Sequence, residues 1–82
     1  MDTTSTITAL AALAQDTRLE TFRLLVAREP LGIPAGEIAR LTGVPQNTMS
    51  AHLAVLARAG LVEGSRKGRF VHYRANLDRL RE

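Results

Sequence analysis

Residues 34–60 constrain the fold of this chain most, because two stretches of helical periodicity lie there on either side of a short break. In the first stretch, apolar residues recur at helical spacing: Ala35, Ile38, Ala39 and Leu41. The break contains Gly43, which can take the left-handed conformation that ends a helix, and Val44 as an apolar anchor. Pro45 suits the opening of the next helix, because its fixed φ is helical and its missing N–H is not needed there. The second stretch carries an apolar stripe of its own: Met49, Leu53, Val55, Leu56 and Ala59.

The opposite face of the second predicted helix is polar. It presents Gln46, Asn47, Thr48, Ser50 and His52. Hydrogen-bonding side chains of this kind read base edges and contact phosphates when a helix lies in a major groove. Residues 34–59 are therefore predicted to form a helix-turn-helix, with these five side chains as candidate DNA contacts.

The periodicity changes after Gly60. Residues 61–66 and 69–74 have strand character, and Lys67-Gly68 separates them. Glycine in a two-residue connection is a hairpin signal, so we expect a wing over residues 61–74. Arg66, Lys67 and Arg69 would surround its turn, where cations can reach phosphates or the minor groove beside the helix.

The net charge of +3 is unevenly distributed. Residues 1–64 hold five Arg against six acids, a net of −1, whereas residues 65–82 hold five Arg and one Lys against two acids, a net of +4. A basic patch on a domain that is otherwise near neutral indicates an anionic partner met at one place. The alternative is a solvated polar end of the chain.

The terminal segments are predicted to form dimerisation helices. Residues 4–14 are apolar on nearly every side, with Ile7, Leu10 and Leu13 at helical spacing, and Leu77 and Leu80 begin a second stripe in residues 76–82. An 82-residue chain buries a small fraction of its surface, so a second copy is expected to cover these residues. The alternative is a terminal helix that packs only on its own core.

Another helix is predicted between these regions. It begins near Asp16, with Thr17 and Glu20 at the spacing of a capping box, and ends before Pro30. Its three arginines are expected to form surface pairs at helical spacing with nearby acids: Arg18, Arg23 and Arg28 with Glu20 and Glu29.

Several classes of protein are excluded by what the sequence lacks. It has no cysteine, hence no disulfide or thiolate site, and its apolar N-terminal run is too short to span a membrane or to serve as a secretion signal, so a cytoplasmic protein is expected. His52 and His72 each lack the converging ligands that a metal needs, so neither metal nor cofactor is expected. The sequence shows no nucleophile with a nearby base, no phosphate-binding loop and no carboxylate pair. An enzyme is therefore not expected.

Residues 10–75 closely resemble the ArsR family of winged helix-turn-helix repressors. The resemblance rests on residues 16–19, on the pattern from Gln46 to Leu53, and on residues 59–62 followed by Lys67-Gly68-Arg69 and residues 71–73. It implies a homodimer that releases operator DNA when an inducer, often a metal ion, binds. Carried over by position, Gln46, Asn47 and Ser50 would face bases, Thr48 and His52 would lie against the DNA backbone, and Arg69 would sit on the wing. The resemblance also places the dimer interface on the terminal helices.

The chain departs from the family at its sensor positions. Pro34 and Gly36 stand where many metal-sensing members carry two cysteines, and after Arg74 only Asp78 could correspond to a ligand of the other familiar metal site. Ala51 stands where a basic residue is frequent in the family, which shifts the expected contacts toward Gln46, Asn47 and the wing. A longer dimerisation helix or a different sensor would lie after residue 82. The inducer therefore stays open.

The sequence thus predicts a single mostly α domain with a small β-hairpin, a winged helix-turn-helix in the order α-α-α-α-β-β-α. Its predicted function is that of a homodimeric, sequence-specific regulator, a repressor bound to a two-fold double-stranded operator and released by an inducer, with a metal or metalloid as one class. One alternative is a winged-helix protein-interaction module without DNA binding. Another is a constitutive DNA-binding regulator with no inducer.

Overall fold

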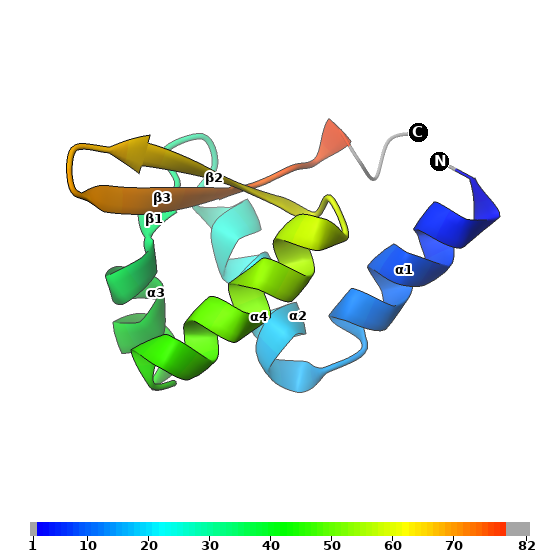
Figure 1. The fold of residues 1–82 in the computed structure, drawn as a ribbon, viewed down its shortest axis with the longest axis horizontal. Coiled ribbons are helices and arrows are strands. Elements are labelled where there is room, and N and C mark those ends of the chain that lie inside the picture. Colours follow the sequence, from blue (N-terminus) through cyan, green and yellow to red (C-terminus); the bar gives the residue numbers. More distant parts are fainter. Residues whose placement is uncertain (1, 79–82) are drawn as a thin grey trace.

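A computed structural model describes residues 2–78 of the chain. Within this range the elements are α1 (Thr3–Leu13), α2 (Asp16–Ala27), β1 (Ile33–Pro34), α3 (Ala35–Thr42), α4 (Gln46–Arg58), β2 (Val62–Lys67) and β3 (Phe70–Ala75) (Figure 1). The predicted fold class is confirmed, and the structure adds the two-residue strand β1 between α2 and α3. Most of the predicted final helix, including Leu80, lies outside the described residues.

The three described strands form one antiparallel sheet in the order β1-β3-β2. Lys67 pairs with Phe70, so the two-residue turn of the wing is Gly68-Arg69. Gly68 has φ +64°, whereas Arg69 has no positive φ, and glycine at the first position of such a turn matches the twist of the flanking strands. The predicted connection, Lys67-Gly68, was wrong by one residue. Glycine can occupy either turn position, and the sequence alone did not distinguish them.

The start of α2 also differs from its prediction. Gln15 is the N-cap residue, and its side-chain oxygen accepts a hydrogen bond from the Arg18 backbone N–H at 2.9 Å. Thr17 already lies inside the helix, so the capping box of Thr17 and Glu20 was wrong. The reason is local geometry, since a cap must precede the first helical residue, Asp16.

The helix-turn-helix forms with the expected ends. Gly43 takes the left-handed conformation, with φ +72°, and ends α3. Pro45 is the N-cap of α4 with ψ 145°, so it stands immediately before the helix rather than at its first helical position. Between these residues the chain reverses within a tight turn.

The core gathers around α4, which contacts α1, α2, α3 and β2. Met49, Leu53 and Leu56 are fully buried, and the Thr21 hydroxyl, also buried, lies 3.7 Å from the Met49 sulfur. The predicted apolar stripe of α3 is confirmed for its two central residues, Ile38 and Ala39, but Leu41 is 39% exposed. The helical period of 3.6 residues places Leu41 to the side of the face formed by Ile38 and Ala39.

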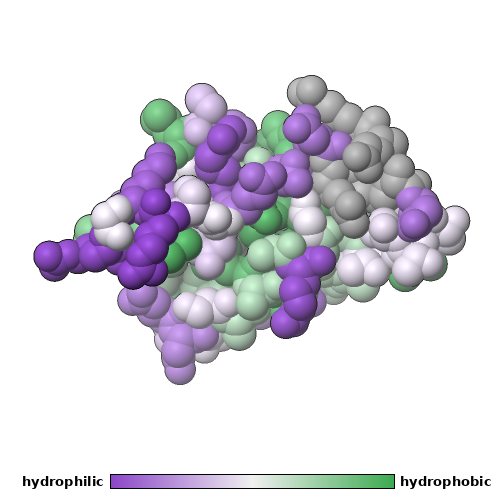
Figure 2. Space-filling model, turned by 45° about the horizontal axis from the view of Figure 1, so that its top comes forward, coloured by the Kyte–Doolittle hydropathy of each residue, from purple (hydrophilic) through white to green (hydrophobic). Residues whose placement is uncertain are grey.

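The molecule measures 36 × 22 × 19 Å, and its two ends differ in character. Figure 1 shows the turn of the wing, α3 and the start of α4 toward one end of the longest axis, and α1 at the other. The hairpin end carries mainly polar and charged side chains in Figure 2. The fold therefore places the start of α4 and the turn of the wing away from the apolar N-terminal helix.

Candidate nucleic-acid interface

The first two turns of α4 present polar side chains to solvent. Gln46, Asn47, Thr48 and Ser50 are all exposed, whereas Met49 between them is fully buried. This alternation follows from the helical period, which places Met49 with Leu53 on the core side. The Gln46 amide lies beside the first turn of α3, since a β-carbon at Gly36 would be 3.8 Å from Gln46 Nε2.

The N-terminus of α4 is open to an anion. Pro45 makes no side-chain cap hydrogen bond, and the first turn contains no acidic residue. By contrast, Asp2 caps α1, and α2 and α3 carry Asp16 and Glu37 in their first turns. Among the first amides of α4, the Thr48 N–H donates to Asn47 Oδ1 at 3.0 Å. Helix N-termini with available N–H groups favour phosphate oxygens.

The wing carries three exposed cations at its turn. Arg66 and Lys67 end β2, and Arg69 occupies the turn itself. Within residues 2–78 none of the three forms an ion pair or a side-chain hydrogen bond. Their charges are thus available to a phosphate backbone, and the hydrophilic projection in Figure 2 lies at this end of the molecule.

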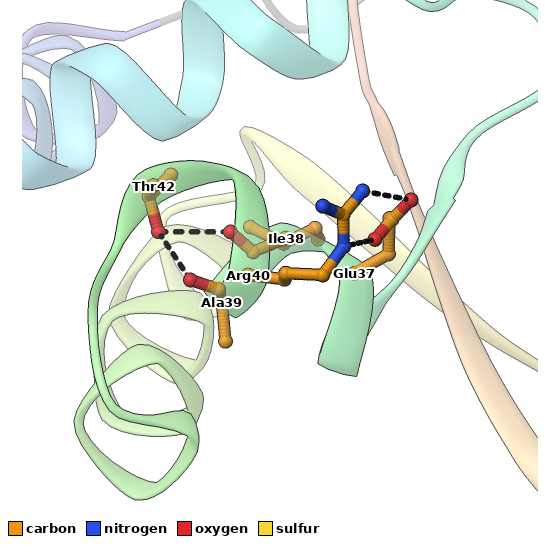
Figure 3. Close-up of polar contacts among 5 residues, drawn as sticks. All are labelled: Glu37, Ile38, Ala39, Arg40 and Thr42. Carbon is orange, nitrogen blue, oxygen red and sulfur yellow. Dashed lines mark hydrogen bonds and ion pairs between the residues drawn. The ribbon is translucent and has the colours of Figure 1, made fainter.

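Two other arginines are already paired. Arg74 on β3 donates to Glu29, two residues after the end of α2, with Nη2 2.9 Å from Oε2, across 45 residues of sequence. On α3, Arg40 binds Glu37 with both arms of its guanidinium, as Figure 3 shows. The hydrogen bond and charge of Arg40 lower the pKa of Glu37. These pairs leave the wing turn as the strongest concentration of unpaired positive charge described.

The helix before the turn is held by its own contacts. The Thr42 hydroxyl donates to the Ile38 carbonyl at 2.8 Å and lies 3.3 Å from the Ala39 carbonyl (Figure 3). The Ala39 carbonyl, one of the last four of α3, also accepts from the backbone N–H groups of Gly43 and Val44. The turn into α4 therefore starts from a well-anchored helix end.

The candidate dimer residues divide into two groups. Ile7 and Leu10 on α1 are 61% and 62% exposed, which leaves an apolar face unpartnered in the single chain. Leu13 and Leu77 are half-buried and pack on the core of the same chain. Among the described candidate dimer residues, only Ile7 and Leu10 are exposed on the surface of the single chain.

Comparisons with known proteins agree with this arrangement. A family model described as a helix-turn-helix domain matches residues 13–65. The homodimeric winged helix-turn-helix DNA-binding domain of Mb0332 from Mycobacterium bovis, described as a possible ArsR-family transcriptional regulator, is 33% identical with a TM-score of 0.84. That alignment covers 94% of this chain and 69% of that chain. This chain belongs to the ArsR family of winged helix-turn-helix transcriptional regulators.

Two further solved structures are similar. An ArsR-like transcriptional regulator from Rhodococcus sp. RHA1 is 29% identical with a TM-score of 0.82, covering 95% of this chain and 71% of that chain. The transcriptional repressor BigR from Xylella fastidiosa is 30% identical with a TM-score of 0.77, and the alignment covers 87% of this chain and 69% of that chain. No curated protein matches the sequence. The family consists of transcriptional regulators rather than enzymes.

One predicted DNA-contacting residue of this ArsR-family chain, His52, has a partner within the same chain. His52 is half-buried, and its Nδ1 lies 3.5 Å from Arg18 Nη1. Arg18 also donates from Nε to the Ala12 carbonyl at 2.6 Å. The expectation that Arg18 forms a helical surface pair was wrong. Sequence spacing could not reveal these contacts, because Arg18 and His52 are 34 residues apart.

The described residues hold no group of three or more His, Cys, Asp or Glu side chains placed to bind a metal ion. His72 lies on β3, and its Nδ1 is buried with no hydrogen-bond partner in that range. No described helix is long and apolar enough to cross a bilayer.

Proposed function

We propose that this protein is a sequence-specific regulator that binds double-stranded DNA as a homodimer. The observation that carries the proposal is the combination of an exposed polar start of α4 with three unpaired cations at the wing turn, toward the same end of the molecule. A polar helix supplies base contacts and a cationic wing supplies phosphate affinity.

In the proposed complex α4 lies in the major groove. Gln46, Asn47 and Ser50 face base edges, while Thr48 and His52 contact the backbone. The 13 residues of α4 span about 20 Å, long enough to lie along the groove. The uncapped N-terminus of α4 receives a phosphate, and Arg66, Lys67 and Arg69 reach phosphates or the adjacent minor groove.

The homodimer forms through α1. Ile7 and Leu10 together present an apolar face that costs free energy while it stays in water, and a second copy would cover it. The homodimeric state of the Mb0332 domain supports a dimer. A two-fold dimer places its recognition helices in half-sites about one helical turn, roughly 34 Å, apart on an inverted-repeat operator.

Binding of this kind would act as repression when the operator overlaps a promoter. The similarity to the repressor BigR supports this assignment. An inducer would release the DNA by favouring a dimer with a different distance between the recognition helices. The similar structures come from bacteria, where the chromosome lies in the cytoplasm, and that is the proposed site of action.

Fluorescence anisotropy with genomic fragments and random duplexes, at several salt concentrations, tests this function. We expect a dimer by mass that selects particular fragments, with log affinity falling linearly with log salt. A folded dimer that binds no duplex at low salt would contradict the proposal and favour a protein-interaction module. Release of the selected fragment by a small molecule or metal ion would identify an inducer, and its absence across a broad panel would favour constitutive binding.

A further inference from the structure

Arg18 lies where α1, α2 and α4 meet. Its Nε donates to the Ala12 carbonyl at 2.6 Å, and its Nη1 is 3.5 Å from His52 Nδ1. Ala12 belongs to the last turn of α1, whose carbonyls have no partner within the helix. A cation at this end is also favoured by the helix dipole. One side chain therefore joins the end of the N-terminal helix to the recognition helix.

The other contacts between α1 and α4 are less directional. A groove between the two helices is lined by Thr8, Ala11 and Val55 together with Arg18, and Ala12 and Ala59 are buried at its base. Close packing of these small side chains sets an approximate crossing angle, and the planar guanidinium adds bonds in set directions. Arg18 is thus the polar contact that further restricts how α4 lies against α1.

The contact also bears on the His52 ring. Arginine only donates hydrogen bonds, so a neutral ring that accepts from Arg18 at Nδ1 carries its proton on Nε2. Nε2–H is left as a donor on the recognition helix, the form that a phosphate oxygen can accept. Arg18 therefore orients His52 as well as the helix that carries it.

We propose that Arg18 is a positioning residue that sets the half-site spacing accepted by the dimer. The inference rests on the proposed function, with the dimer joined through α1. A rotation of α4 against α1 by about 10°, acting over roughly half of the 36 Å length, moves the recognition helix by about 3 Å. This displacement is close to the rise of one base pair, about 3.4 Å. Without Arg18 the dimer tolerates neighbouring spacings.

The test compares affinities for the selected operator and for versions with one base pair added or removed between half-sites. We expect the affinity of the wild type to fall about tenfold or more with either change, because a helix displaced by one base pair loses its base contacts. In Arg18→Met the ratio of the affinities for the selected and the altered spacing should be close to one, while affinity for a single half-site stays within about threefold of the wild-type value. Arg18→Lys, which keeps the charge without the planar fork, should also lose discrimination. Arg23→Met, at an exposed arginine of the same helix, is the matched control and should keep it.

Arg18→Met with the wild-type spacing ratio would overturn the inference, and so would equal loss of affinity at every spacing. If that variant does not fold, Arg18→Lys decides in the same operator series: loss of spacing discrimination supports the inference, and the wild-type ratio refutes it. A wild type that binds no DNA would refute the proposed function and the spacing role together, whereas a wild type that binds but shows no spacing preference would refute only the latter.

Discussion

Arg69→Gln removes one exposed cation from the turn of each wing, and hence two from a dimer. Arg69 forms no ion pair or side-chain hydrogen bond within the described residues, so the substitution should leave the fold unchanged and act on the bound state. Each lost phosphate contact makes the slope of log affinity against log salt about 0.9 less negative, so two contacts give about 1.8. When the salt concentration rises from about 50 to 200 mM, the affinity of the variant should fall by a factor roughly ten times smaller than the factor for the wild type.

Anisotropy titrations across that salt range, on the selected operator and on random duplex, measure the slope. The effect should be the same on both DNAs, because phosphate contacts carry no sequence information. Arg23→Gln is the matched control, since it removes the same charge from an exposed position on α2. An unchanged slope in Arg69→Gln would refute the wing contact, and equal flattening in both variants would show a general charge effect instead.

Gln46→Ala should lower affinity for the operator while leaving random-duplex affinity nearly unchanged, since one good base contact discriminates by about 1–3 kcal/mol; equal losses on both DNAs would contradict base reading. Leu53→Ala should lower the free energy of unfolding by about 2–5 kcal/mol in urea titrations, because Leu53 is 0% exposed, and a loss below 1 kcal/mol would contradict that burial. Gly36→Ala should stabilise by about 0.5–1 kcal/mol, because a β-carbon there meets only ordinary contacts. Gly43→Ala should destabilise by about 1–2 kcal/mol because of its φ of +72°, and equal signs for the two glycines would refute this reasoning.

Much of the fold could be predicted because its signals are local. Helical periodicity placed Met49, Leu53 and Leu56 on one buried face, and Gly43 marked the end of α3. The wing was predicted within one residue from its glycine and its change of period, since both strands and the turn lie one residue later than predicted. The strand β1 was missed, because a two-residue strand has no period and forms only when β3 pairs with it.

The candidate DNA contacts could be named from the sequence, but their surroundings could not. The exposure of Gln46 and Ser50 follows from their place opposite the core stripe. The half-burial of His52 depends instead on α2 packing beside α4, which no spacing within α4 reveals. In the same way, the pairing of Glu29 with Arg74 arises because the end of α2 lies beside β3.

The sequence by itself determined the order of the elements that carry periodicity, the polar face of the recognition helix and the concentration of positive charge at the wing, because each depends on neighbours a few residues apart. Only the tertiary structure decided which cations are free and which are held. Arg18 and Arg74 have the same chemistry as Arg69, yet each is engaged by groups that the fold brings within about 3.5 Å. A charged side chain becomes a ligand contact or an internal support according to what packing places beside it, and that is a property of the folded chain.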